Sequence, residues 1–169
     1  MSDQLFDPFN DRLSRDIRND LSESLLTCLR ERRPTAARTV ADRYLAGNPG
    51  PVYVSYIHNR LECYARFLEQ LDEDETDPLR LGFALWDLGL HFEVHEVLEQ
   101  AWLRADGDDK ALFQALIRAA GVVIKRECGS IAAAAKMAAK ARPVLEAHRD
   151  RLAAYTETAA LFRTLNPAT

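Results

Sequence analysis

Apolar residues recur at intervals of three or four positions along most of this chain. The clearest stripe has a strict four-residue spacing and consists of Leu13, Ile17, Leu21, Leu25 and Leu29. An α-helix has about 3.6 residues per turn, so this spacing places the whole stripe on one helical face. Only seven glycines and seven prolines interrupt the pattern in 169 residues. The sequence therefore predicts an all-α fold, a bundle of about seven helices packed as helical hairpins.

Turn signals divide this pattern into segments. They are the glycine- and proline-rich run 47–51, the acidic run 72–77 before Pro78, and Gly89, which is expected to separate helices over 79–88 and 90–105. Pro143 is expected to end an alanine-rich helix and to start the last one, because proline favours the first turn of a helix. We expect a single domain over 1–169, with N-terminal helices over 10–75, a core over 78–147 that carries the motif below, and a C-terminal helix over 148–169.

Charge and cysteine content narrow the classes of partner. The chain has 22 Lys and Arg against 26 Asp and Glu, a net charge of −4, which argues against nucleic-acid and anionic-membrane partners. There is no secretion signal and no run of about 18 uncharged apolar residues, so we expect a cytoplasmic protein with no membrane segment. Cys28, Cys63 and Cys128 form no Cys-x-x-Cys pair and are expected to be reduced.

The helix expected over 90–105 carries the residues that are the strongest candidates for ligand binding or catalysis. At about 100° per residue, one stripe of this helix contains His91, His95, Glu99 and Trp102. Apolar residues flank the stripe, and the residues expected on the opposite, polar side are Glu93, Glu96 and Gln100. We therefore expect His95 and Glu99 in the middle of the buried face of this helix.

A buried carboxylate is costly to desolvate unless it is paired, hydrogen-bonded or bound to a cation. Three hypotheses follow for Glu99. In the first, it forms a structural pair with His95. In the second, both residues bind a divalent metal ion with His91 as a further ligand, because side chains four residues apart can reach one ion. In the third, Glu99 is a catalytic general base with a pKa raised by burial, and His95 is its partner.

The pattern His95-x-x-x-Glu99-x-x-Trp102, preceded by Trp86 and Gly89, resembles the motif of a bacterial and archaeal family known as domain of unknown function 309. The resemblance covers roughly 78–147 and includes the segment Phe113-Gln114-Ala115-Leu116-Ile117. It implies an all-helical domain of unknown function with a suggested metal site, in which the histidine and the glutamate are ligands and the tryptophan is a neighbouring wall. His91 departs from the aromatic residue usual at its place in that family.

Two further sets of polar residues are candidates for a site. Gln114 and Arg118 are four residues apart on the next helix, where the glutamine could hydrogen-bond the His/Glu pair and the arginine could hold an anionic ligand. A solvated helix face is the alternative explanation for Arg118. His58 and Glu62 repeat the His-x-x-x-Glu spacing. Neighbouring apolar residues, and not His58, form the apolar face of that helix.

Taken together, the pattern predicts binding of a divalent metal ion or a small polar ligand by His95 and Glu99. The bound metal or Glu99 could serve a hydrolytic reaction. The alternative is a non-catalytic module that binds peptides or dimerises, because helix pairs joined by short turns resemble tetratricopeptide hairpins. No repeat of 34 residues is visible, and His95 and Glu99 would then be a structural pair. Leu161 and Phe162 would serve a homodimer if the last helix exposed them. Whether the protein is an enzyme stays open at this point.

Overall fold

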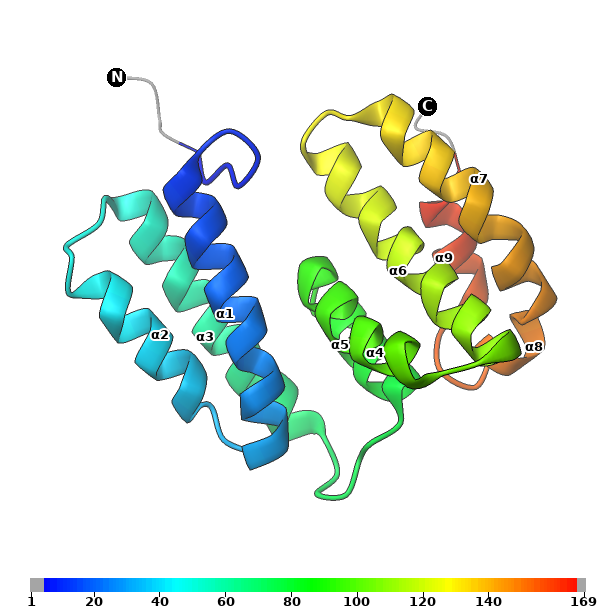
Figure 1. Ribbon diagram of the computed structural model, residues 1–169, viewed down its shortest axis with the longest axis horizontal. Helices are drawn as coiled ribbons and strands as arrows, with labels where there is room; N and C mark the ends of the chain where they lie inside the picture. Colours follow the sequence, from blue (N-terminus) through cyan, green and yellow to red (C-terminus); the bar gives the residue numbers. More distant parts are fainter. Residues whose placement is uncertain (1–4, 167–169) are drawn as a thin grey trace. The chain divides into compact units, whose positions relative to one another are not determined.

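The computed structural model describes residues 5–166, and every regular element within this range is a helix (Figure 1). This confirms the all-α fold. The helices of the described range are α1 (Arg12–Glu31), α2 (Thr35–Leu45), α3 (Pro51–Gln70), α4 (Pro78–Asp87), α5 (His91–Arg104), α6 (Gly107–Glu127), α7 (Ile131–Ala147), α8 (Arg149–Leu152) and α9 (Thr158–Thr164). Two of them, α8 and α9, are short.

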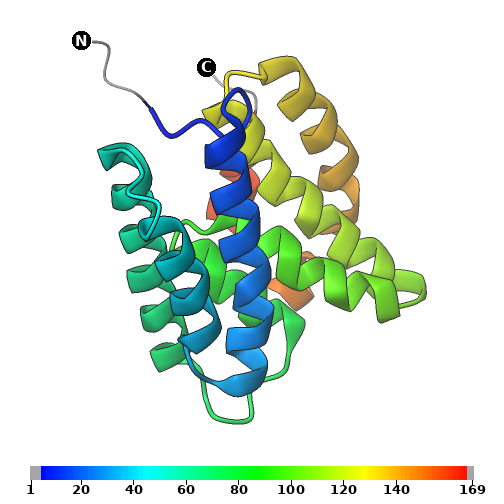
Figure 2. The ribbon, with the colours of Figure 1, turned by 60° about the vertical axis from the view of Figure 1, so that its left-hand side comes forward.

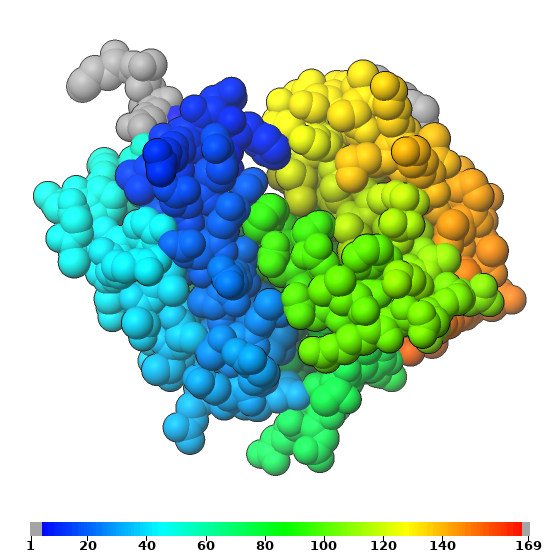
Figure 3. All heavy atoms as spheres, in the orientation of Figure 1, coloured from blue at the N-terminus to red at the C-terminus, as the bar shows by residue number. Residues whose placement is uncertain are grey.

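Contacts divide the chain into two compact units, one ending at Asp74 and the other beginning at Glu75. The division falls inside the acidic run 72–77, where the sequence separates the N-terminal helices from the motif-bearing core. The single domain over 1–169 stays a prediction. In the space-filling view, side chains fill the space between the helices within each unit (Figure 3).

The first unit consists of α1, α2 and α3, which contact one another in pairs and lie side by side in two views (Figure 2). Ile17, Leu21 and Leu25 of the four-residue stripe are fully buried, whereas Leu13 at its start is 37% exposed. The stripe therefore forms the core only in its central turns. Asp11 caps the N-terminus of α1, because its carboxylate accepts hydrogen bonds from two backbone amides of the first turn.

The second unit is built from neighbouring hairpins. Helix α5 packs against α4 and α6, and α6 packs against α7. Asp77 caps α4 by accepting from the amide of Leu79. Gly89 has a φ of 72°, a left-handed conformation that glycine adopts without steric cost, and it allows the reversal between α4 and α5. The predicted helix break at this glycine is confirmed.

Helix α7 continues through Pro143, so the prediction that this proline starts a new helix is wrong. Proline has no amide hydrogen, and the carbonyl of Ala139 therefore loses its partner one turn away. Ala139 is exposed, so water can hydrate this carbonyl. Ala141 and Leu145 are fully buried on either side of the proline, and their packing adds to the strong helix propensity of the alanine-rich sequence.

The C-terminal helix expected over 148–169 is also wrong. In the described part of this segment the chain forms two short helices, α8 and α9, joined by a turn at Tyr155. The hydroxyl of Tyr155 donates a hydrogen bond to Asp77 Oδ2 at 2.8 Å. The apolar pattern of the last segment does not predict this tertiary contact. Leu161 and Phe162 are 2% and 7% exposed, so they belong to the core and do not form a surface for a homodimer. Residues 167–169 lie outside the described range.

Among the described residues, none of the helices combines the length and the apolar composition needed to cross a membrane.

Candidate functional site

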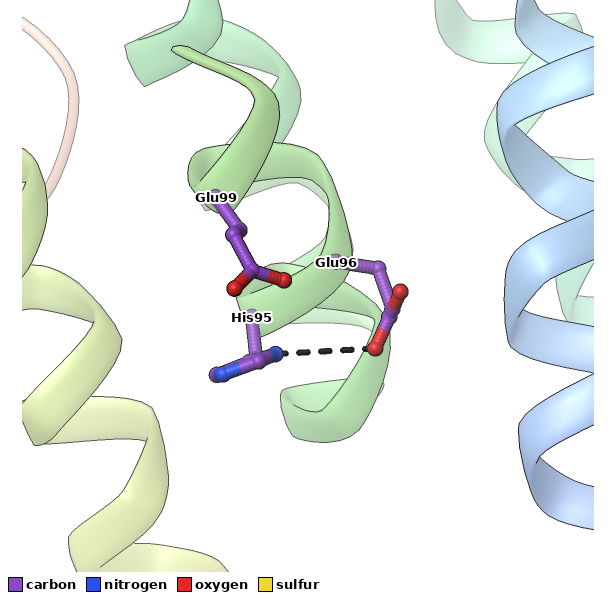
Figure 4. Close-up of side chains that lie close together, drawn as sticks. All are labelled: His95, Glu96 and Glu99. Carbon is purple, nitrogen blue, oxygen red and sulfur yellow. Dashed lines mark ion pairs between the residues drawn. The ribbon is translucent and has the colours of Figure 1, made fainter. Parts of the chain in front are cut away.

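Helix α5 brings three ionisable side chains together on one part of its surface. One ligand atom from each of His95, Glu96 and Glu99 lies within 4.8 Å of the others. Both carboxylates lie close to the histidine ring (Figure 4). Because all three residues belong to one helix of 14 residues, the backbone of α5 holds their positions relative to one another. We call these three residues the His95 cluster.

His95 is the centre of this cluster. Its Nδ1 lies 3.5 Å from Oε1 of Glu96, and the two side chains are 39% and 22% exposed. Within the described part of the chain, this Nδ1 is buried and makes no hydrogen bond. Contact with the Glu96 carboxylate raises the pKa of His95, burial opposes this rise, and the negative charges of Glu96 and Glu99 add to it. The cluster therefore favours a positive charge at its centre.

The burial of α5 differs from the sequence-based expectation. His95 and Glu99 are half-buried and lie beside the core, not in the middle of the buried face. The buried residues of this helix are Glu93, Val94, Val97 and Leu98. Glu93, assigned to the polar side, is fully buried. The apolar face is turned from the predicted one because α5 has apolar residues on several sides, and its packing partners select which of them is buried.

Glu96 is the member of the cluster that the sequence analysis missed. It was assigned to the polar side because adjacent residues point about 100° apart on a helix. A glutamate side chain is long enough to bend back along the helix surface, so it reaches Nδ1 of its neighbour His95. The sequence signal for this contact is that a glutamate with a flexible side chain directly follows the histidine.

The structure does not bring His91 into the cluster. Its ring packs edge-on against Trp86 of α4, across the turn between the two helices, with 4.8 Å between the ring centroids. Trp102 lies half-buried near the end of α5, and the ammonium of Lys110 lies 5.2 Å from its ring centroid. This places a positive charge and an aromatic face one turn beyond Glu99.

Gln114 and Arg118 are half-buried on α6, the helix that packs against α5. Their roles in ligand binding stay predictions. The second His-x-x-x-Glu pair, on α3, is exposed at both residues, and Glu62 forms an ion pair with Arg66 at 2.6 Å. His58 and Glu62 therefore make no comparable cluster on their own helix.

The donor set of the His95 cluster suits a divalent cation. One imidazole nitrogen and carboxylate oxygens are ligands for Zn²⁺, and carboxylates also suit Mn²⁺ and Mg²⁺. Two ligands of a tetrahedral zinc ion lie about 3.3 Å apart when each bond is about 2 Å long. The atoms of the cluster lie within 4.8 Å of one another, so the glutamate side chains would have to move closer to the imidazole to hold one ion.

Comparison with known proteins supports the family resemblance. Residues 79–137 match the model of a family described as a domain of unknown function (DUF309). No curated protein and no solved structure matches the chain. The matched segment extends from α4 into α7 and contains all of α5, and it is shorter than the range 78–147 expected from the motif. Over this segment, which includes the His95 cluster, the chain resembles the DUF309 family, as the sequence predicts.

Proposed function

We propose that the protein binds a divalent cation through His95, Glu96 and Glu99. The observation that carries this proposal is the distance of at most 4.8 Å between one ligand atom of each residue. The proposal replaces the predicted ligand His91, whose ring lies against Trp86, by Glu96.

Two further features support a cation at this place. The Nδ1 atom of His95 is buried, and its ion-pair partner, Oε1 of Glu96, lies 3.5 Å away, so coordination of a metal ion would give this atom a closer partner. Two carboxylates on adjacent turns repel each other, and a bound cation relieves this repulsion. The half-buried position would leave room for a small polar ligand beside a bound ion.

The proposal extends to hydrolytic chemistry. A divalent cation bound there would act as a Lewis acid on a coordinated substrate oxygen. Glu99 and Glu96 give the cluster two carboxylates, so one can remain a ligand while the other accepts a proton. Glu99 is the proposed proton acceptor because it lies one turn nearer to Trp102, the predicted wall of the ligand site.

The experiment that tests cation binding is calorimetric titration of the metal-free protein with Zn²⁺ and with Mn²⁺, followed by elemental analysis of the dialysed complex. The variants are His95→Ala and Glu99→Gln. His58→Ala is a matched control because His58 is exposed and is also four residues from a glutamate. We expect one bound ion per chain in the wild type and in the control, and at least about tenfold weaker binding in both cluster variants, because each loses one ligand.

Unchanged affinity in His95→Ala would contradict the proposal, and so would the absence of stoichiometric binding of either ion. Absence of binding together with a lower melting temperature of His95→Ala would identify the cluster as a structural pair. The helical peptide-binding or dimerisation module would then be the function to test. For the hydrolytic step, turnover of bis(p-nitrophenyl) phosphate and p-nitrophenyl acetate is measured with and without the ion. We expect ion-dependent turnover of at least one of these probes to be lost in Glu99→Gln even at ion concentrations that saturate this variant.

A further inference from the structure

A groove of about 370 Å³ lies beside α7, away from the residues of the His95 cluster. Its walls come from the end of α6, from α7 and from the residue after α9, and the residues that line it are Arg126, Ile131, Ala135, Ala138, Ala139, Arg142 and Leu165. Small-molecule sites in proteins have volumes of about 300 to 1,000 Å³. The groove is therefore large enough for a small ligand.

The alanines of α7 explain why this space is open. Ala135 and Ala139 are exposed and Ala138 is 6% exposed, so the floor of the groove consists of methyl groups with no longer side chain to fill it. Ile131, at the start of α7, is 49% exposed and adds a large apolar side chain. The groove therefore offers an apolar surface to a ligand with an apolar part.

Two guanidinium groups converge at the same groove. Arg126 donates to the backbone carbonyls of Thr164 and Asn166, and Arg142 donates to the side-chain oxygen of Asn166 at 2.8 Å. Both cations are thus held in place by neutral acceptors of one short segment. Both arginines bond to Asn166, so two positive charges lie beside one residue, and a bound anion would interact favourably with both.

The charges of the lining favour an anion clearly. Of the described residues that line the groove, two are arginines and none is acidic, although the whole chain has a net charge of −4. Glu146 approaches Arg142 to 3.5 Å, but its side chain is 50% exposed, so water screens this ion pair. A guanidinium has five N–H donors, and the bonds above leave donors of both arginines for a carboxylate or phosphate.

We propose that this groove binds a small amphiphilic anion, with its carboxylate or phosphate at Arg126 and Arg142 and its apolar part on the alanine floor of α7. The site is independent of the cation site on α5. The occupant is a small molecule with one anionic head group, because the volume of the groove is that of a single ligand site.

The test is calorimetric titration of the full chain with sodium decanoate below its micelle concentration, with decanol as the uncharged probe. Ala135→Leu fills the groove from an exposed position, so the fold is retained. Ala132→Leu is the matched control, because Ala132 is exposed on the same helix and does not line the groove. Arg142→Gln removes one of the two charges and keeps a hydrogen-bonding side chain.

We expect saturable decanoate binding that Ala135→Leu abolishes and Ala132→Leu leaves unchanged. Arg142→Gln should weaken this binding about tenfold, because a charge-assisted hydrogen bond is lost. Decanol should bind more weakly than decanoate. Equal binding of the two probes, no decanoate binding, or equal effects of the two leucine variants would each overturn the proposal.

Discussion

The Nδ1 atom of His95 lies 3.5 Å from Oε1 of Glu96, its neighbour along α5. Adjacent helix residues point in different directions, and only the reach of the glutamate side chain makes this contact. The contact turns a His/Glu pair one turn apart into a cluster of three possible ligands. Substitution of Glu96 therefore distinguishes best between a cation site and a structural pair of His95 and Glu99.

Glu96→Gln is expected to weaken Zn²⁺ binding at least about tenfold, because an amide oxygen is a poorer ligand than a carboxylate. The measurement is calorimetric titration, as for the other cluster variants. Glu127→Gln is the control, since Glu127 is an exposed carboxylate at the end of α6. If Glu96→Gln binds Zn²⁺ as tightly as this control, His95 and Glu99 act without the third residue.

The N-terminal cap of α1 should make stability depend on pH. Hydrogen bonds from the Ser14 side chain and backbone, and from Tyr53, hold the pKa of Asp11 below its ordinary value of 3.8. A lowered pKa in the folded state stabilises the fold above the ordinary pKa, and this contribution is lost as the pH falls through the folded value. Asp11→Asn keeps a capping oxygen but does not titrate in this range.

The stability difference between the wild type and Asp11→Asn should therefore be largest near pH 7 and should shrink as the pH falls below 3.8. Urea unfolding at a series of pH values measures this difference. Asp16→Asn, one turn further along the exposed side of α1, is the control. The same pH profile in both variants would show that the cap does not cause the effect.

Tyr155→Phe is expected to destabilise the fold by about 1 kcal/mol, because the hydroxyl loses its hydrogen bond to the Asp77 carboxylate. Asp77→Ala should cost about 1 kcal/mol more, because it also removes the cap at the amide of Leu79. Urea unfolding of the two variants and of the double variant gives the coupling between them. Additive effects would mean that the bond between α4 and the turn after α8 contributes nothing to stability.

Gly121 allows α6 and α7 to approach each other closely. A Cβ added at this position would lie 2.2 Å from Cε of Met137, so the methionine must move. Gly121→Ala gains about 1 kcal/mol of helix propensity but overpacks this contact, which costs about 1 to 3 kcal/mol.

The same substitution should be more favourable by at least about 1 kcal/mol in a Met137→Ala background, where the clash is absent. Thermal or urea unfolding of the four proteins of this cycle gives the difference. Equal effects of Gly121→Ala in both backgrounds would mean that Met137 adapts without cost.

The sequence by itself determined the class of fold and the breaks between several helices. Periodic apolar residues, the glycine- and proline-rich run 47–51, the acidic run 72–77 and Gly89 are local signals, and a helix forms from local hydrogen bonds. It also determined the resemblance over the motif and placed His95 and Glu99 within one turn of each other, because this distance depends on helical spacing alone.

The tertiary structure decided which side of each helix is buried and where the C-terminal helices end. Glu93 is buried because α4 and α6 select one side of α5, which carries apolar residues on several sides. Glu96 contacts His95 through the reach of its own side chain. Tyr155, in the turn after α8, donates a hydrogen bond to Asp77, which is 78 residues away in the sequence. Such contacts involve residues that are distant in the sequence, and local periodicity does not identify them. Packing therefore determines the final positions of these side chains.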